Sequence, residues 1–373
     1  MISCGEASGD LYAAALVREM RAIAPGLTAF GFGGPRLAAA GAELAGEYTK
    51  FAVTGLAEAL SVVTRSFRML KTLGALARER KPDVFVAVDF PDFNFRLLPV
   101  MHGLGIPVVY YISPQLWAWR PGRIRQIQRY VSKMLVIFPF EVDVYSRAGV
   151  PVEFVGHPLV ELLEQAGRDE AWVRGVGLDP GRPIVALLPG SRPNEVERLV
   201  PVMAEAMPAI ARDITGVQFL VARAPSLPGH FFEAFSRAGQ PVAVVAGAAD
   251  AVLAAADVVV TASGTATVQA ALHGTPMVIV YRLSGLTYAV GRAFVKVPHY
   301  GMVNLIAGRR IVPELIQHAC TAQAVHAETV ALLEDQARSA AMRADLADVR
   351  SRLGGPGATA RAARAVLAAA RRP

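Results

Sequence analysis

Residues 84–94 place two carboxylates after a run of apolar residues. Five apolar residues lead into Asp89, which predicts a strand buried on both faces with a carboxylate at its carboxyl end. A carboxylate in that place could take a proton from a substrate hydroxyl, so Asp89 is a candidate general base. An Asp before a helix also acts as a cap, and this second interpretation of Asp89 stays open. We expect Asp92 to cap the helix that follows.

Residues 184–192 combine an apolar run with a glycine turn. Five apolar residues are followed by Pro189, Gly190, Ser191 and Arg192, and then by a helical pattern. Strand, turn and helix start would gather free backbone N–H groups at the positive end of a helix, and Arg192 adds a guanidinium. The segment is a candidate phosphate site, although many ordinary turns share this pattern. No Gly-Lys-Ser/Thr follows, which argues against a Walker-type hydrolase.

Residues 258–269 repeat this arrangement of strand, small-residue turn and helix. The turn offers backbone N–H and hydroxyl donors from Ser263, Gly264, Thr265, Ala266 and Thr267. Gln269 lies four residues after Thr265 on the same face of the predicted helix, where its amide could bond a ribose hydroxyl. Two candidate phosphate sites in one domain indicate a diphosphate ligand.

The elements that must position these residues form two sets. Valine- and isoleucine-rich runs alternate with alanine-rich helical patterns, which is typical of βαβ units in a parallel sheet. The first set has apolar runs at residues 2–4, 27–32, 84–88, 108–112 and 134–138. The second set has them at residues 184–188, 217–221, 242–245, 258–261 and 277–281. We therefore predict an α/β fold with two doubly wound, Rossmann-like domains and a cleft between them, and ligands beyond the carboxyl ends of the strands.

The domain limits follow from glycine and proline punctuation. Residues 154–158 separate the two sets of strands, so we predict domains at residues 1–155 and 156–345, and a helical tail at residues 346–373. The tail is rich in alanine and arginine, and we leave open that it packs back on the first domain.

Composition narrows the class of protein. The chain has 373 residues, of which 53% are hydrophobic and 18% charged, and this balance excludes a disordered chain. Two distant cysteines, Cys4 and Cys320, argue against a disulfide framework and for the reducing cytoplasm. We expect neither a membrane-spanning segment nor a secretory leader. The net charge of +7 suits a phosphate-bearing partner, a nucleic acid or an anionic membrane.

One helical pattern is both apolar and basic. Arginine and lysine at residues 65, 68 and 71 interleave with an apolar stripe of Leu56, Leu60, Val63, Phe67 and Leu70. Such a stripe packs in a core in many proteins, but a basic amphipathic helix also lies in a lipid interface, and both interpretations stay open. A second basic region, residues 93–140, contains no acidic residue.

Several ordered motifs resemble those of the lipid-A-disaccharide synthases, a bacterial glycosyltransferase family of the two-domain GT-B type. The resemblance covers nearly the whole chain. It is carried by GEASGD at residues 5–10, VDFPDFN at 88–94, SPQLWAWR at 113–120, FVGHP at 154–158, LPGSR at 188–192, SGTAT at 263–267, NLIAG at 304–308 and VPELIQ at 312–317. The family commonly has Glu where Gln269 stands.

The resemblance implies a reaction and roles for residues. The family transfers 2,3-diacylglucosamine from UDP-2,3-diacylglucosamine to 2,3-diacylglucosamine 1-phosphate, with inversion and without a metal, and releases UDP. By this resemblance Asp89 would be the base, Glu6 and Asp10 would join it in the catalytic site, and Arg192 with residues 263–267 would stabilise the departing UDP. Other cleft residues would be Ser8, Gly9, Asn94, Trp119, Arg120 and Asn304.

The resemblance also implies a location and partners. Leu60, Val63 and Phe67 would contact the anionic cytoplasmic face of the inner membrane, where the protein would be peripherally bound. We expect no cofactor, no metal site and no nucleic-acid partner, because the Asp89-x-x-Asp92 spacing differs from the metal-binding Asp-x-Asp pattern and no nucleic-acid module accompanies the basic region. A homodimer is left open, and the arginines after Trp119 are candidates for holding the acceptor phosphate.

Three other classes of protein remain as alternatives. A UDP-N-acetylglucosamine 2-epimerase would share the architecture but would have no use for a basic amphipathic helix. The transferase that adds N-acetylglucosamine to the lipid-linked peptidoglycan precursor is closer in chemistry, but its glycine-rich N-terminal loops differ from residues 5–10. A non-enzymatic nucleotide- or lipid-binding protein would need no base at Asp89.

Overall fold

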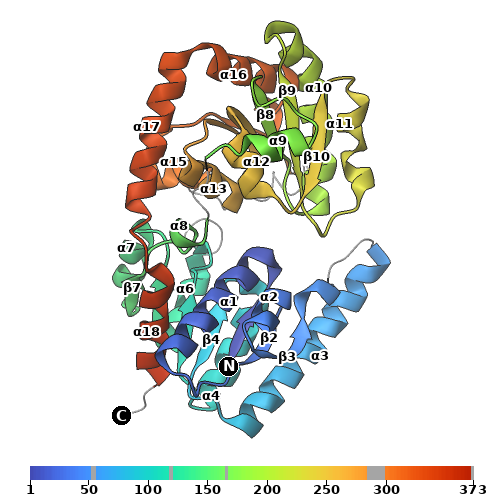
Figure 1. The fold of residues 1–373 in the computed structure, drawn as a ribbon. Coiled ribbons are helices and arrows are strands. Elements are labelled where there is room, and N and C mark those ends of the chain that lie inside the picture. Colours follow the sequence, from blue (N-terminus) through green and yellow to red (C-terminus); the bar gives the residue numbers. More distant parts are fainter. Residues whose placement is uncertain (52–55, 117–120, 164–166, 284–298, 371–373) are drawn as a thin grey trace. The chain divides into compact units, whose positions relative to one another are not determined.

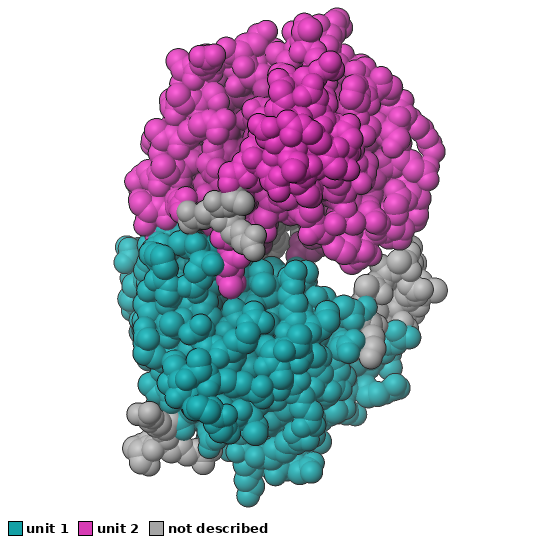
Figure 2. All heavy atoms as spheres, in the orientation of Figure 1, with its two compact units in different colours: residues 1–161, 353–373 teal, residues 162–352 magenta. Residues whose placement is uncertain are grey.

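The computed structural model describes residues 1–51, 56–116, 121–163, 167–283 and 299–370, and the chain divides into two compact units. Unit 1 contains residues 1–161 and 353–373, and unit 2 contains residues 162–352 (Figure 2). The chain thus leaves unit 1 once and returns to it near the C-terminus. Each unit is an α/β structure with one parallel sheet (Figure 1), so the predicted fold class is confirmed.

Unit 1 has a seven-stranded sheet in the order β3-β2-β1-β4-β5-β6-β7. Its strands are β1 Ile2–Cys4, β2 Phe30–Gly33, β3 Glu43–Glu47, β4 Phe85–Val88, β5 Val108–Tyr111, β6 Lys133–Val136 and β7 Val152–Phe154. Its helices are α1 Glu6–Ile23, α2 Pro35–Ala39, α3 Leu56–Arg80, α4 Pro91–Gly103, α6 Ile124–Tyr130, α7 Phe140–Arg147 and α18 Ala358–Ala370, with α8 Leu159–Leu162 at the exit. Strands β1, β2, β4, β5 and β6 were predicted, and β3 and β7 were not.

Unit 2 has a six-stranded sheet in the order β10-β9-β8-β11-β12-β13. Its strands are β8 Ile184–Leu188, β9 Gln218–Arg223, β10 Val242–Ala246, β11 Val258–Ala262, β12 Met277–Tyr281 and β13 Glu314–Ile316. Its helices are α9 Glu170–Gly175, α10 Pro193–Asp213, α11 Glu233–Arg237, α12 Ala249–Ala255, α13 Thr265–His273, α15 Met302–Ala307, α16 Ala322–Glu334 and α17 Gln336–Arg352. All five predicted strands are present.

Both sheets reverse their strand order at an internal point. In unit 1 the chain builds β1, β2 and β3 outward and then returns to place β4 on the other side of β1. In unit 2 it builds β8, β9 and β10 and returns to place β11 beside β8. The loops after these central strands leave the carboxyl edge in opposite directions, which opens the crevice where ligands bind in such sheets.

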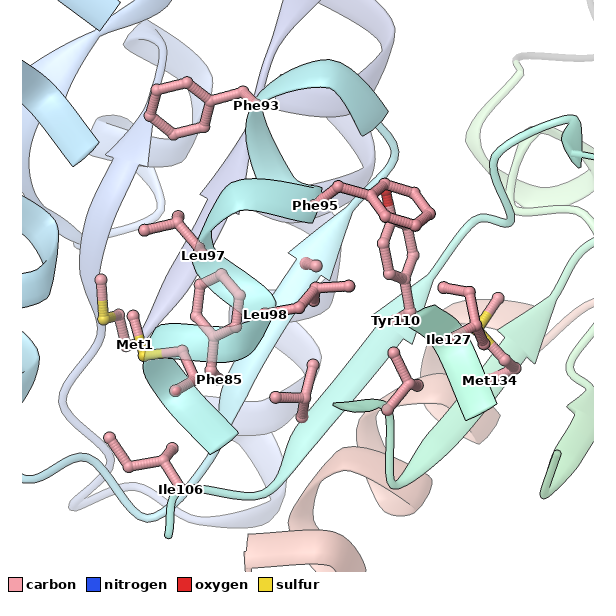
Figure 3. Close-up of a cluster of buried hydrophobic side chains, with 14 of the residues drawn as sticks. Met1, Phe85, Phe93, Phe95, Leu97, Leu98, Ile106, Tyr110, Ile127 and Met134 are labelled. Atoms are coloured by element: carbon pink, nitrogen blue, oxygen red, sulfur yellow. The ribbon is translucent and has the colours of Figure 1, made fainter. Parts of the chain in front are cut away.

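The core of unit 1 holds the central strands in place. Side chains of β4 and β5 pack against α4 and its neighbours, and Figure 3 shows Phe85, Leu98 and Tyr110 among them. Phe85, Tyr110 and Leu98 are fully buried. Because helices cover both faces of a parallel sheet, the central strands need apolar residues at every position.

The return of the chain to unit 1 is fixed by polar contacts. Glu161 accepts hydrogen bonds from the backbone N–H groups of Gly357 and Thr359, at the start of α18. Arg361 donates to the carbonyl oxygens of Val155, Gly355 and Pro356. Helix α18 then packs along α1. The predicted tail at residues 346–373 is thus divided between the two units. Residues 346–352 belong to α17 of unit 2, and residues 353–373 belong to unit 1.

Among the described residues, every helix is too short or too polar to cross a lipid bilayer.

Burial of His157 predicts acid sensitivity of the fold. The imidazole is 2% exposed, its Nδ1 accepts the Leu159 N–H at 3.2 Å, and burial lowers its pKa from 6.5 to about 3. Below pH 6.5 the unfolded chain binds a proton at His157 that the folded chain does not, so stability falls as pH falls. Between pH 6.5 and 5 we expect this residue alone to remove ~2 kcal/mol from the free energy of unfolding.

Urea unfolding of the parent and of His157→Gln across this pH range measures the effect. The glutamine Oε1 can accept the Leu159 N–H but does not titrate, so the variant should lose less stability on acidification. Parallel curves for the two proteins would contradict the assignment.

Candidate functional site

In unit 1 the motifs at residues 5–10 and 89–94 begin in short loops that leave adjacent strands and lead into α1 and α4. Cys4 of β1 pairs with Val88 of β4, so Gly5 and Asp89 both follow at the carboxyl edge. The two loops touch: a Cβ on Gly5 would lie 2.4 Å from a ring carbon of Phe90. Glycine is therefore required at position 5 for this approach. The reversal of strand order has brought two of the predicted motifs together.

Asp89 is half-buried at this edge and has a left-handed backbone, with φ of +45°. Its N–H donates to the carbonyl oxygen of Tyr111 at 3.0 Å, which continues the pairing of β4 with β5. The N-cap of α4 is Phe90, so Asp89 does not cap this helix, and the prediction that Asp92 is the cap is wrong. Because Pro91 is already helical, Asp92 lies within the first turn, where it pairs with Arg123 at 2.9 Å.

Asp10 is buried and holds a neighbouring loop. Its carboxylate accepts the backbone N–H groups of Gly34 at 2.8 Å, Arg36 at 3.0 Å and Leu37 at 3.1 Å, at the start of α2. These contacts favour a positioning role over direct contact with substrate. Glu6 is exposed at the first position of α1, in a left-handed conformation with φ of +60°. Of the two predicted acids, Glu6 is the one at the surface.

Ser8 and Gly9 complete the first turn of α1. Ser8 is half-buried, and Gly9 is buried against the ends of β1 and β4. A Cβ on Gly9 would make ordinary contact with Cys4, at 3.5 Å, so glycine keeps the helix close to the sheet without being strictly required.

Two predicted cleft residues lie inside the protein. Asn94 is fully buried: its Oδ1 accepts the Ser3 hydroxyl at 2.7 Å, and its Nδ2 donates to the Asp89 carbonyl oxygen at 2.8 Å. Asn304 is also fully buried, and its Nδ2 donates to the Glu314 carboxylate at 2.7 Å. The structure shows both amides organising loops from within.

In unit 2 the two candidate phosphate loops also leave adjacent strands. Leu188 of β8 pairs with Thr261 of β11, and the turns that follow both lead into helices. Ser191 and Arg192 are exposed before α10, and the Arg192 guanidinium lies 3.2 Å from the Glu195 carboxylate. Pro193 has no N–H group, and the N–H groups of Glu195 and Thr267 donate to the carbonyl oxygens of Arg192 and Gly264. The remaining N–H groups in the first turns of α10 and α13 are the donors that these turns can offer to an anion.

Hydrogen bonds within the turn after β11 define its shape. The Ser263 hydroxyl donates to the Tyr300 carbonyl oxygen at 3.0 Å, and the buried Thr267 hydroxyl donates to the Gly264 carbonyl oxygen at 2.8 Å. Gly264 and Thr265 are exposed, and Ala266 is half-buried. The surface of the turn is therefore offered by the backbone of residues 264–266 and by the Thr265 side chain, while Ser263 and Thr267 hold its shape.

Gln269 of α13 is hydrogen-bonded to a residue of a different helix. Its Nε2 donates to Asp250 of α12 at 3.2 Å, and His273 Nε2 lies 3.5 Å from the same carboxylate oxygen. Glu in place of Gln269 would put two carboxylates together, so the amide suits this neighbour. Asp250, like Glu314 at the start of β13, was not predicted, because these contacts join separate elements.

Other predicted residues are described only in part. Trp119 and Arg120 lie outside the described residues, as do the side chains of Leu60 and Val63. The Phe67 ring is 50% exposed, and the Arg96 guanidinium lies 4.8 Å from its centroid. Within the described ranges, no group of three or more His, Cys, Asp or Glu side chains is placed to hold a metal ion.

Comparison with solved structures assigns the class of fold. A UDP-N-acetylglucosamine 2-epimerase from Neisseria meningitidis superposes with a TM-score of 0.71 at 10% identity, over 98% of this chain and 99% of that chain. The glycosyltransferase of kitacinnamycin superposes with a TM-score of 0.64 at 18% identity, over 99% and 97%. The fold is that of the GT-B glycosyltransferases and the related epimerases.

Sequence comparison narrows the class to one family. The family model described as lipid-A-disaccharide synthetase matches residues 1–369. Lipid-A-disaccharide synthases from Geobacter sulfurreducens and from Anaeromyxobacter dehalogenans strain 2CP-C are 44% and 45% identical over 369 residues, 98% of this chain and 96% of each relative. The chain belongs to the lipid-A-disaccharide synthase family. It is a hexosyltransferase of lipid A biosynthesis that uses a UDP-sugar donor and a lipid acceptor. The UDP-N-acetylglucosamine 2-epimerases, which we considered as an alternative, have the same fold but belong to a different family.

The turn after β8 provides a test of the nucleotide site. Gly190 has φ of +113°, and a Cβ there would lie 2.6 Å from a Glu195 carboxylate oxygen. We expect Gly190→Ala to displace the turn and to weaken UDP binding about tenfold or more, a loss of ~1.4 kcal/mol. Titration calorimetry with UDP measures this.

Gly175→Ala is the matched control, because its added methyl group meets nothing within 4 Å and the residue ends helix α9, outside the turn after β8. Equal UDP affinity in the parent and both variants would place the nucleotide elsewhere.

Proposed function

We propose that the protein transfers 2,3-diacylglucosamine from UDP-2,3-diacylglucosamine to the 6-hydroxyl of 2,3-diacylglucosamine 1-phosphate, with inversion and without a metal. The proposal rests on the family and on one structural observation. The sheet of unit 1 presents a carboxylate where its strand order reverses, and the sheet of unit 2 presents two helix-start turns where its own order reverses. These are the chemical groups that sugar transfer from a nucleotide diphosphate requires.

Asp89 would act as the general base. Its carboxylate takes the proton of the acceptor 6-hydroxyl as that oxygen attacks the anomeric carbon of the donor. The bond from the anomeric carbon to the diphosphate oxygen breaks, and UDP leaves with the electron pair. One displacement of this kind inverts the anomeric centre and gives the β-1,6-linked disaccharide 1-phosphate. The half-buried position of Asp89 at the edge of the sheet suits a base that must meet a substrate.

The turns of unit 2 would stabilise the departing diphosphate. The N-terminal N–H groups of α10 and α13 carry partial positive charge, and the Arg192 guanidinium adds a full charge. The Arg192 guanidinium pairs with Glu195, whose carboxylate lies beside Gly190. Fixed donors of this kind act on charge that develops during the reaction, so a metal is not needed for the same role.

The acceptor lipid and the membrane surface would be met by unit 1. The exposed Phe67 ring on α3 and the cation above it combine apolar and basic character, which suits an interface with anionic lipid. Peripheral association with the cytoplasmic face of the inner membrane follows from this proposal. Arg120 and Arg123 would help to hold the acceptor phosphate, with Arg123 exchanging its present partner, Asp92, for the ligand.

The role of Asp89 is tested by Asp89→Asn. We expect the variant to form the disaccharide product at least ~100-fold more slowly, because an amide cannot accept the hydroxyl proton. Mass spectrometry of the product from UDP-2,3-diacylglucosamine and 2,3-diacylglucosamine 1-phosphate, in detergent with EDTA present, follows the reaction and the need for a metal together.

Asp83→Asn is the control for this variant, since Asp83 is exposed before the opposite end of β4. UDP affinity should be unchanged in both variants. If Asp89→Asn forms product at the rate of the parent, the proposed transfer reaction stands but Asp89 is not its base. If EDTA abolishes the activity of the parent, the proposed metal independence is contradicted.

The membrane role of α3 is tested by Phe67→Asp. Removing an exposed phenyl ring and adding a negative charge should weaken binding to anionic phosphatidylglycerol vesicles by roughly tenfold, in line with the free energy of burying such a side chain. Vesicle flotation measures the bound fraction.

Arg78→Ala, an exposed residue further along the same helix, should bind vesicles nearly as the parent does. If Phe67→Asp binds vesicles as well as the parent, this face of α3 does not meet lipid.

A further inference from the structure

Backbone strain in unit 1 is concentrated at the edge that carries Asp89. Among the described residues, six non-glycine residues have φ in the left-handed region. Four of them follow the neighbouring strands β1, β4 and β5: Glu6, Asp89, Phe90 and Ile112. Left-handed conformations cost free energy in residues with a Cβ, and they persist only where the surroundings enforce them. Asp89 and Phe90 are consecutive, so this turn needs the strongest support.

Two buried donors converge on the peptide group between Asp89 and Phe90. The Tyr110 hydroxyl donates to the Asp89 carbonyl oxygen at 2.8 Å, and the Asn94 Nδ2 donates to the same oxygen at 2.8 Å. Tyr110 and Asn94 are both 0% exposed. Asn94 is fixed in turn by the Ser3 hydroxyl, at 2.7 Å. Tyr110 of β5 and Asn94 of α4 thus hold the carbonyl oxygen directly after β4, the strand between β1 and β5. Ser3 of β1 supports this arrangement through Asn94.

The Phe90 side of the turn is held by packing. The Phe90 ring stacks on Phe93 with centroids 5.3 Å apart and lies 6.3 Å from the Phe32 ring. On its other side it lies against Gly5, where a Cβ would clash. Phe90 therefore has little room to move, and the left-handed turn is supported by hydrogen bonds at its first residue and by ring packing at its second.

We propose that Tyr110 is a positioning residue for the transfer reaction, which acts by holding the Asp89 carbonyl oxygen so that the Asp89 carboxylate stays in its reactive place. This inference rests on the proposed role of Asp89 as the base. Loss of the hydroxyl leaves a buried carbonyl with one donor fewer and lets the strained turn relax, which swings the Asp89 side chain. Burial raises the pKa of Tyr110 well above its usual range, so its hydroxyl stays protonated and remains a donor.

Tyr110→Phe removes this hydrogen bond and little else. We expect kcat to fall by roughly 10- to 100-fold with KM within about twofold, because a displaced base slows the chemical step without changing substrate contacts. Tyr111→Phe is the matched control: Tyr111 is the next residue of the same strand, is 0% exposed, and its hydroxyl has no hydrogen-bond partner among the described residues. It should keep the parent kcat.

The double variant Asp89→Asn, Tyr110→Phe separates positioning from other effects. If Tyr110 acts through Asp89, then Tyr110→Phe should slow the Asp89→Asn enzyme by less than about twofold. An equal loss in both backgrounds, or a parent-like kcat for Tyr110→Phe, would overturn the proposal. A full rate for Asp89→Asn alone would instead overturn the proposed base.

Ser3→Ala gives a second test that does not depend on the stability of Tyr110→Phe. It loosens Asn94, the other donor to the Asp89 carbonyl oxygen, and should lower kcat several-fold at unchanged KM. If Tyr110→Phe does not fold, the Ser3→Ala variant decides the question. A folded Ser3→Ala enzyme with the kcat of the parent would overturn positioning through the Asp89 carbonyl oxygen.

Discussion

The reversal of strand order in each parallel sheet is the constraint on which the candidate site depends. Because β4 returns beside β1, the loops that follow Cys4 and Val88 leave the sheet as neighbours although these residues are 84 positions apart in the sequence. The same reversal brings the turns after Leu188 and Thr261 together in unit 2. The residues of these loops do not by themselves bring the loops together. The hydrogen bonds between the paired strands do, because each loop begins where its strand ends.

Buried polar side chains then set the shape of each loop. The Asp10 carboxylate accepts hydrogen bonds from three backbone N–H groups at the start of α2. The side-chain amides of Asn304 and Asn94 likewise form hydrogen bonds that fix nearby loops. Buried polar groups are costly unless they are hydrogen-bonded, so each of these networks holds one loop conformation and disfavours others. Glu6, Arg192 and Thr265 are left at the surface by this division, where a substrate can reach them.

The sequence predicted the central strands and the edge strand β10, and it missed the other three edge strands. Strands such as β4, β8 and β11 show unbroken apolar runs because burial demands them. The missed strands β3, β7 and β13 are all edge strands, and polar residues such as Glu43, Glu153 and Glu314 interrupt them. The loops after the central strands could be predicted for the same reason, since their positions follow from the strands that were found.

What a motif residue does could not be read from its motif. Residues 88–94 include Asp89, which is half-buried at the edge, and Asn94, which is fully buried and bonded to Ser3, 91 positions earlier. Sequence reasoning placed both in the cleft, because the contact that holds Asn94 inside lies on another strand. Tyr110 was hidden for the same reason: in a buried strand a tyrosine looks like any apolar residue until its hydroxyl is seen to meet the Asp89 carbonyl oxygen. Reactive and supporting residues thus differ by contacts across the sheet, and these exist only once the strands have paired.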